Sequence, residues 1–167
     1  EKKLSIVGGQ TLEFGVDCND IISARKVPLT HLELIKFMKY RSPFSHPTII
    51  FRKNVFESLS GYDVNIFPED YDFFVRAYLK GFKFGNVKEN VLWFRLGENQ
   101  ADVLKRRWGF VYAKKEALLY FKFYKLDFFS LIHFLKILFF KTSLRIIPFF
   151  AFKYIYFNLF RNKRIKE

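Results

Sequence analysis

The chain has 167 residues, half of them apolar, which is enough to bury one compact core but not two full domains. Lys and Arg outnumber Asp and Glu by 29 to 16, so an anionic partner is favoured, such as a phosphorylated ligand, anionic lipid or nucleic acid. Cys18 is the single cysteine, which excludes an internal disulfide framework and a multi-cysteine zinc module and favours a reducing compartment.

The first part of the chain predicts short strands. Residues 4–7 are typical of a buried strand closed by Gly8 and Gly9, and residues 11–14 alternate as a second strand, so we expect a hairpin. Residues 17–28 carry turn chemistry and little periodicity. Because the chain starts at Glu1 and a strand follows at once, we also expect that an amino-terminal portion of the fold is missing.

Two short helices and a strand are expected next. Thr30 followed by Glu33 forms a capping-box pattern that predicts a helix over residues 32–39. After an irregular loop marked by two prolines, residues 48–51 are β-branched and aromatic enough for a buried strand. A brief helix over 54–59 should stop at Gly61.

A longer helix should begin at Pro68, with acids in its first turn, and end near Lys80 before Gly81. Its expected core stripe consists of Phe74, Val75, Tyr78 and Leu79. Residues 82–87 and 91–95 then predict two strands joined by a polar turn at 88–90.

The end of the chain differs in kind from the rest, since half of the 24 phenylalanines lie between Phe121 and Phe160 among basic residues. We therefore predict an α/β portion over residues 1–119 and an amphipathic helical tail over 120–167, divided into two helices by Pro148. The basic residues of the tail interrupt every apolar run before it reaches the ~18 residues that a spanning helix needs.

Three stretches occur in order: SHPTIIFRK at 45–53, GYD at 61–63 and PEDYD at 68–72, where a helix opens. Together with later pieces up to RRWG at 106–109, they resemble the carboxyl-terminal half of a family 2 glycosyltransferase over roughly residues 4–119. Ser60 departs from the family pattern, which often has a second glycine there. The resemblance implies a partial GT-A fold, a mixed sheet with flanking helices, and inverting sugar transfer from a nucleotide-sugar donor to a glycan or lipid-linked acceptor.

The resemblance also implies roles for individual residues. Asp70 would be the base that accepts the acceptor hydroxyl proton, and Glu69 would orient it or contact acceptor hydroxyls. His46, Asp72 and Trp108 are expected on the acceptor side. Arg106 and Arg107 would meet the departing diphosphate, since guanidinium groups match phosphate oxygens. The competing interpretation of the acidic first turn is ordinary helix capping, and that of the two arginines is solvated surface charge.

A divalent metal, Mn or Mg, is expected in the complete enzyme, with its ligands mostly outside this chain. Asp70 and Asp72 are not expected to hold it, because residues two apart on a helix point in different directions. Without the nucleotide-binding half we predict no transferase activity from this chain alone. The resemblance implies a role in cell-envelope polysaccharide biosynthesis. It also implies that the protein is cytoplasmic and peripheral at the cytoplasmic membrane.

For the tail two interpretations stay open. Residues 128–160 fit helices that lie in a bilayer interface, with apolar side chains buried and basic side chains near anionic lipid. Alternatively, the aromatic residues pack on the body and the charges face water. The alternative function for the whole chain is a non-catalytic basic module that binds a membrane or nucleic acid, although no RNA-binding or zinc-finger motif is present and we expect no nucleic acid partner.

Overall fold

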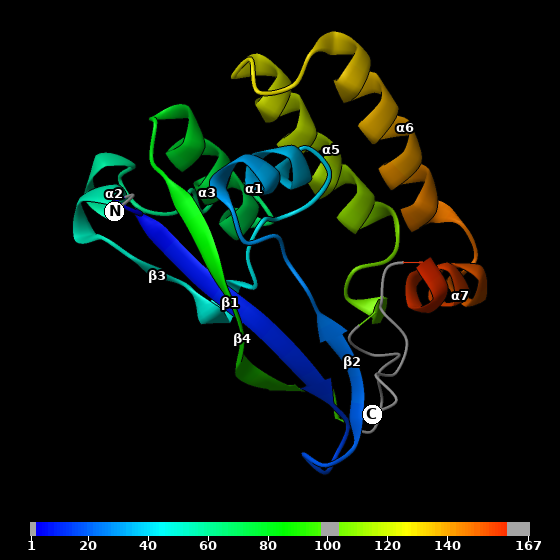
Figure 1. Ribbon diagram of the computed structural model, residues 1–167. Coiled ribbons are helices and arrows are strands. Elements are labelled where there is room, and N and C mark those ends of the chain that lie inside the picture. The colour runs from blue at the N-terminus through cyan, green and yellow to red at the C-terminus, as the bar shows by residue number, and fades with distance from the viewer. Residues whose placement is uncertain (1–2, 98–103, 160–167) are drawn as a thin grey trace.

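The computed structural model describes residues 3–97 and 104–159, which form a mixed α/β fold, as the sequence predicts. The strands are β1 (Ile6–Phe14), β2 (Ile21–Arg25), β3 (Ile50–Phe51) and β4 (Phe84–Arg95). The helices are α1 (His31–Met38), α2 (Lys53–Ser58), α3 (Glu69–Leu79), α5 (Phe110–Lys125), α6 (Leu131–Ile146) and α7 (Phe149–Leu159), with a short 3-10 turn, η1 (His46–Thr48), before β3. Helices α3, α5 and α6 gather on one side of the sheet (Figure 1).

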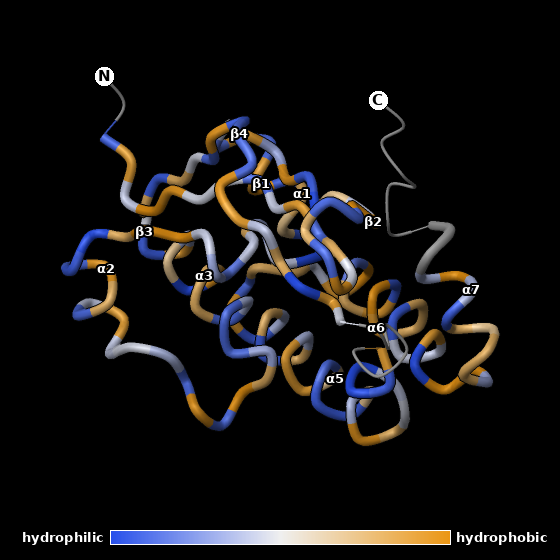
Figure 2. The backbone as a smooth tube through the Cα atoms, turned by 90° about the horizontal axis from the view of Figure 1, so that it is seen from below, coloured by the Kyte–Doolittle hydropathy of each residue, from blue (hydrophilic) through white to orange (hydrophobic). Residues whose placement is uncertain are grey.

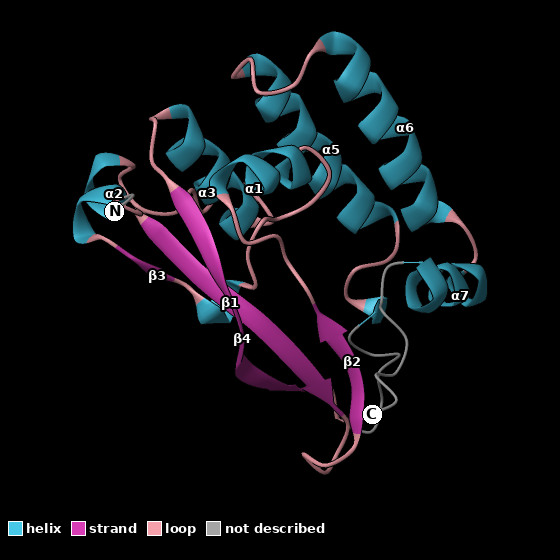
Figure 3. Cartoon of the chain, viewed as in Figure 1, coloured by secondary structure: helices cyan, strands magenta, loops and turns pink. Residues whose placement is uncertain are grey.

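Strand β1 is the centre of the sheet (Figure 3). It pairs antiparallel with β2 over its second half and with β3 at Ile6 and Val7, and parallel with β4 along most of its length. The predicted hairpin between residues 4–7 and 11–14 is wrong, because the chain continues straight through Gly8 and Gly9. The hairpin that does form joins β1 to β2. Strand β2 lies within residues 17–28, for which only turns were expected.

The two glycines serve close packing rather than a turn. A Cβ atom on Gly8 would lie 2.5 Å from Oδ1 of Asn86, and one on Gly9 would lie 2.5 Å from a methyl carbon of Val91. The register between the two strands shifts here: two residues along β1, from Gly8 to Gln10, correspond to four along β4, from Asn86 to Asn90. Strand β4 crosses β1 in this region (Figure 1). Strand β4 is therefore one continuous strand, and the predicted turn at 88–90 is wrong.

Helices α1 and α3 follow the sequence signals closely. Thr30 and Glu33 form the predicted capping box of α1. Helix α3 starts after Pro68, whose preceding peptide bond is cis, and its C-cap is Lys80, followed by Gly81 with φ of +82°.

The core stripe of α3 differs in part from the prediction, since Leu79 is exposed. The buried residues of α3 are Tyr71, Asp72, Phe73, Phe74, Val75 and Ala77. Phe74 packs against Phe44 with ring centroids 4.7 Å apart, in a core built largely from aromatic residues.

The tail forms the predicted helices on either side of Pro148. Helix α5 runs through the proposed boundary at residue 119, and Leu119, Phe123 and Phe128 join the same core as α3. The aromatic tail thus packs on the body through one of its faces. Polar and apolar segments alternate along α6 (Figure 2), and within the described residues no helix has the length and apolar character needed to cross a bilayer.

A substitution at Gly8 tests the crowded crossing. Because a new Cβ meets both Asn86 and Phe44, we expect Gly8→Ala to lower the free energy of unfolding by about 1–3 kcal/mol in urea denaturation. Gly8→Asn should cost more, because it adds volume to the same space. Lys88→Ala, at an exposed position of β4, is the control and should stay within about 0.5 kcal/mol of the wild type. Better tolerance of Asn than of Ala would indicate a turn instead.

Candidate functional site

The three sequence stretches that carry the resemblance converge in space. The ring of His46 contacts the ring of Tyr62 at a centroid distance of 5.8 Å, and Tyr62 lies 4.6 Å from Phe73 of α3. Burial raises the pKa of Tyr62, and the charges of Asp70 and Glu69 raise it further, so both carboxylates lie near this phenol. The stretches at 45–53, 61–63 and 68–72 therefore form one surface.

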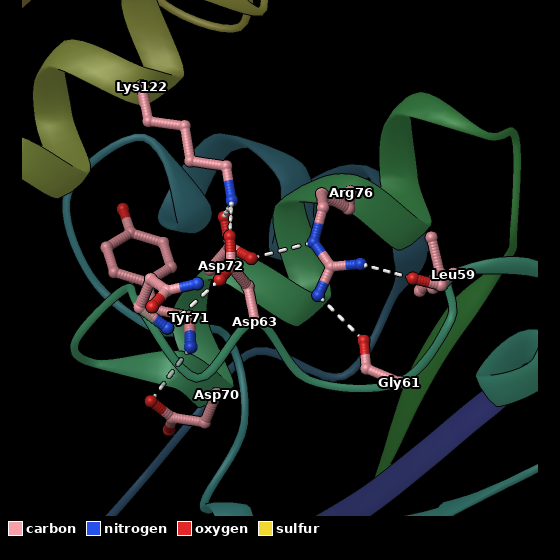
Figure 4. A network of polar contacts seen from close by, with 9 residues as sticks. Leu59, Gly61, Asp63, Asp70, Tyr71, Asp72, Arg76 and Lys122 are labelled. Atoms are coloured by element: carbon pink, nitrogen blue, oxygen red, sulfur yellow. Dashed lines mark hydrogen bonds and ion pairs between the residues drawn. The ribbon is translucent and has the colours of Figure 1, made fainter.

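Asp72 fixes this arrangement from inside. Its side chain is fully buried, and its carboxylate lies 2.7 Å from Nε of Arg76 and 2.7 Å from Nζ of Lys122 (Figure 4). The same guanidinium donates to the carbonyl oxygens of Leu59 and Gly61 at 2.8 and 2.9 Å. These two bonds hold the turn in which Ser60 and Gly61 both have positive φ, with Ser60 at the position where the family pattern often has glycine.

Lys122 extends the network to the stretch at 61–63. Its ammonium, on α5, lies 2.8 Å from Oδ2 of Asp63 as well as 2.7 Å from Asp72. The hydrogen bond from Lys122 is the main reason why the pKa of Asp63 is lowered. Helix α5 is thereby bound to the stretches at 61–63 and 68–72.

A pocket of about 390 Å³ opens beside the first turn of α3. Its acidic edge, which we define as Glu69 and Asp70, is formed by that first turn. Oδ1 of Asp70 accepts from the backbone amide of Tyr71 at 2.8 Å, which satisfies one of the free amides at the helix start. The helix dipole favours negative charge at this end, and both carboxylates line the pocket.

Helices α5 and α6 also contribute to the pocket lining. Glu116 of α5 accepts from Nε and Nη2 of Arg145 of α6 at 2.8 and 3.1 Å, a bidentate pair in the interior. Burial would lower the pKa of Arg145, but the hydrogen bond and charge of Glu116 outweigh it and raise the pKa. The guanidinium also lies 4.8 Å from the centroid of the Tyr112 ring. This pair joins α5 to α6 at the pocket.

Tyrosines also line the pocket. Burial raises the pKa of Tyr112 to about 12, with the charge of Glu116 adding to the shift. Burial also raises the pKa of Tyr71 and Tyr120 well above the ordinary value, so all three phenols stay neutral near pH 7. The hydroxyl of Tyr71 donates to the carbonyl oxygen of Met38, and that of Tyr120 donates to Glu116 at 3.2 Å, so these two residues contribute ring surface to the pocket lining.

The structure separates the sequence-predicted residues into two groups. Asp70, Glu69, His46 and Arg107 line the pocket. Nδ1 of His46 is buried and has no hydrogen-bond partner among the described residues.

The other predicted residues lie elsewhere. Asp72 lies in the interior, paired with Arg76 and Lys122, and is outside the pocket lining. Trp108 donates from Nε1 to the carbonyl oxygen of Ile147 at 2.8 Å and contacts the ring of Phe149 edge-on, which joins it to the tail rather than to the pocket. Arg106 is exposed away from the pocket lining.

Several pocket residues were missed from the sequence. Arg41 follows α1, and the others lie on α5 and α6: Tyr112, Glu116, Tyr120, Lys141 and Arg145. The residues on α5 recur every four positions, and Lys141 and Arg145 are also four apart, so each set follows one face of its helix. This stripe of polar residues along otherwise apolar helices was a signal in the sequence that could have identified them as pocket residues. No such signal marked Arg41.

The described residues hold no group of three or more His, Cys, Asp or Glu side chains arranged for a metal ion. Asp70 and Asp72 do not form one, because Asp72 is enclosed with two cations while Asp70 points the other way (Figure 4). A resident divalent metal therefore does not fit this pair, and no step of the chemistry below depends on one.

Comparisons with curated proteins point to one class. An uncharacterized glycosyltransferase of Haemophilus influenzae is 34% identical over 121 residues, covering 72% of this chain and 43% of the relative. An Escherichia coli UDP-Gal:alpha-D-GlcNAc-diphosphoundecaprenol beta-1,3-galactosyltransferase is 28% identical over 149 residues, 89% of this chain and 53% of the relative. The amylovoran biosynthesis glycosyltransferase AmsE of Erwinia amylovora is 28% identical over 96 residues, 58% of this chain and 35% of the relative.

The chain is therefore related to glycosyltransferases, and it spans about half the length of the curated relatives it matches. No protein-family model matches the chain, and no solved structure matches it either.

A double-mutant cycle tests the buried network. Lys122→Met leaves Asp72 buried with one cation fewer, so we expect the free energy of unfolding to fall by about 1–3 kcal/mol. Asp72→Asn should cost less in the Lys122→Met background than in the wild type, with a coupling energy of roughly 0.5–3 kcal/mol. Lys125→Met, exposed on the same helix, is the control. Additive effects of the two substitutions would show that the ion pair does not stabilise the fold.

Proposed function

We propose that this chain is the acceptor-side part of a nucleotide-sugar-dependent, inverting glycosyltransferase of family 2, with a GT-A fold in the complete protein. The observation that supports this most is the convergence of three short stretches around a pocket edged by Glu69 and Asp70. The relationship to named glycosyltransferases over most of the chain supports the same class.

In this proposal Asp70 is the general base. Inverting transfer needs a carboxylate that takes the proton of the acceptor hydroxyl as that oxygen attacks the anomeric carbon and the nucleoside diphosphate leaves. Ser42, whose hydroxyl lies 3.5 Å from Oδ2 of Asp70, approaches this carboxylate. Glu69, its neighbour in the pocket lining, would orient the acceptor, and Arg107 would neutralise the departing diphosphate.

The donor half, together with any divalent metal and its ligands, belongs to parts of the complete protein outside this chain. We therefore propose that residues 1–167 alone do not transfer sugar. The proposed setting is cell-envelope polysaccharide biosynthesis on the cytoplasmic side of the membrane. Two relatives carry names that mention a lipid-linked sugar and a polysaccharide, which supports a glycan or lipid-linked acceptor here.

We further propose that α6 and α7 rest on the membrane surface. Their outer apolar face consists of the exposed side chains of Leu131, Ile132, Leu135, Phe139, Phe140, Ile146, Phe150 and Tyr154. Lys136 and Lys153 are exposed on the same two helices, where they can meet anionic headgroups. Arg145 and Lys141, in contrast, turn inward to the pocket, so the tail combines packing on the body with an open apolar face.

Asp70→Asn in the complete protein tests the catalytic assignment. Without a base, incorporation of labelled sugar from nucleotide sugars into a membrane lipid extract should fall about 10²- to 10⁴-fold. Thermal stability should stay unchanged, because Asp70 makes few contacts within the protein. Glu89→Gln, exposed on β4, should retain full activity. A folded Asp70→Asn protein with wild-type activity would refute the assignment.

Vesicle binding separates this proposal from a nucleic-acid-binding module. Replacing Phe139 and Phe140 together by Ser should weaken sedimentation of the protein with anionic phospholipid vesicles by about tenfold or more, because each phenylalanine loses its apolar burial. Phe110→Ser, equally exposed but on α5, is the matched control. Binding to single-stranded RNA in preference to vesicles would contradict the membrane assignment.

A further inference from the structure

The pocket carries more positive than negative charge, and most of that excess has no place in the chemistry assigned above. Among the described lining residues, five basic side chains face three carboxylates, and Glu116 is already paired with Arg145. The basic lining residues are Arg25, Arg41, Arg107, Lys141 and Arg145.

Three of these residues form one cluster, which we call the basic wall: Arg41, Lys141 and Arg145. Burial lowers the pKa of Lys141, and the charges of Arg145 and Arg41 lower it further, against the opposing effect of Glu116. All three line the same pocket, where their like charges repel one another. An anion bound among them would offset both the repulsion and the cost of burial.

The basic wall and the acidic edge line the same cavity. Its volume of about 390 Å³ has room for a sugar and a pair of phosphates together. A sugar hydroxyl presented to Asp70 would leave its phosphates to the guanidinium and ammonium groups of the basic wall.

The basic wall also adjoins the outer apolar face. Lys141 and Arg145 lie on α6, and so does Leu144, which lines the pocket one helical turn after exposed Phe140. The proposed membrane-facing side of α6 and the pocket lining therefore lie on the same helix. Tyr40 and Tyr156 add ring surface to the lining.

We infer that the basic wall binds the diphosphate of a lipid-linked acceptor, a sugar diphosphate whose second phosphate carries a long apolar chain. This inference rests on the proposed function. It assigns the acceptor's phosphates to Arg41, Lys141 and Arg145, the sugar to the acidic edge and the tyrosines, and the apolar chain to the outer apolar face of α6. Arg107 remains the group nearest the departing nucleoside diphosphate.

The test uses the complete protein and three probes: farnesyl diphosphate, farnesol, and uridine diphosphate with manganese. In calorimetric titrations, Lys141→Met should raise the dissociation constant for farnesyl diphosphate by roughly tenfold or more, since one charge-assisted contact is lost. Lys88→Met, exposed on β4 and outside the pocket, should leave it unchanged. Lys141→Arg should restore binding, which guards against a variant that fails to fold.

The outcomes separate this inference from the proposed function. Farnesol should bind far more weakly than farnesyl diphosphate, and the dissociation constant for uridine diphosphate should not change in Lys141→Met. Equal loss of both diphosphates would assign the basic wall to the donor and overturn the inference. Unchanged binding of farnesyl diphosphate in Lys141→Met would also overturn it, while loss of activity in Asp70→Asn would still uphold the proposed function.

Discussion

A buried carboxylate organises the candidate site. Asp72 is fully enclosed, and a buried charge is tolerated only when it is paired and hydrogen-bonded. Arg76 and Lys122 meet this requirement, and each also binds a second segment: Arg76 binds the turn at 59–61, and Lys122 binds Asp63. Neutralising one charge thus brings α3, the turn before it and α5 together, and the pocket lies beside this junction.

The pocket that results has two unlike sides. The amides at the start of α3 favour the carboxylates of the acidic edge, whereas Arg41 and α6 contribute cations that repel one another in the partly desolvated pocket. A ligand with hydroxyl groups at one end and phosphates at the other satisfies both sides. In the proposed membrane orientation of α6 and α7, an acceptor embedded in lipid and the enzyme would meet at one surface.

Local signals in the sequence predicted much of the fold, and contacts distant in sequence account for the errors. The capping box at Thr30 and the start of α3 at Pro68 depend on residues within one turn, and both are confirmed. Gly8 and Gly9 were misjudged because the reason for them is a crossing strand about 80 residues away. Likewise, the pairing of Asp72 with Lys122, 50 residues later, carried no local signal.

The central claim is that this chain holds the acceptor side of a glycosyltransferase and that its donor side lies elsewhere in the protein. Calorimetric titration of nucleoside diphosphates with manganese tests it most directly, first into residues 1–167 and then into the protein extended to the length of its relatives. The account predicts saturable binding to the extended protein and at least tenfold weaker binding to residues 1–167. Absence of binding to both forms would contradict the account and favour a membrane-binding module.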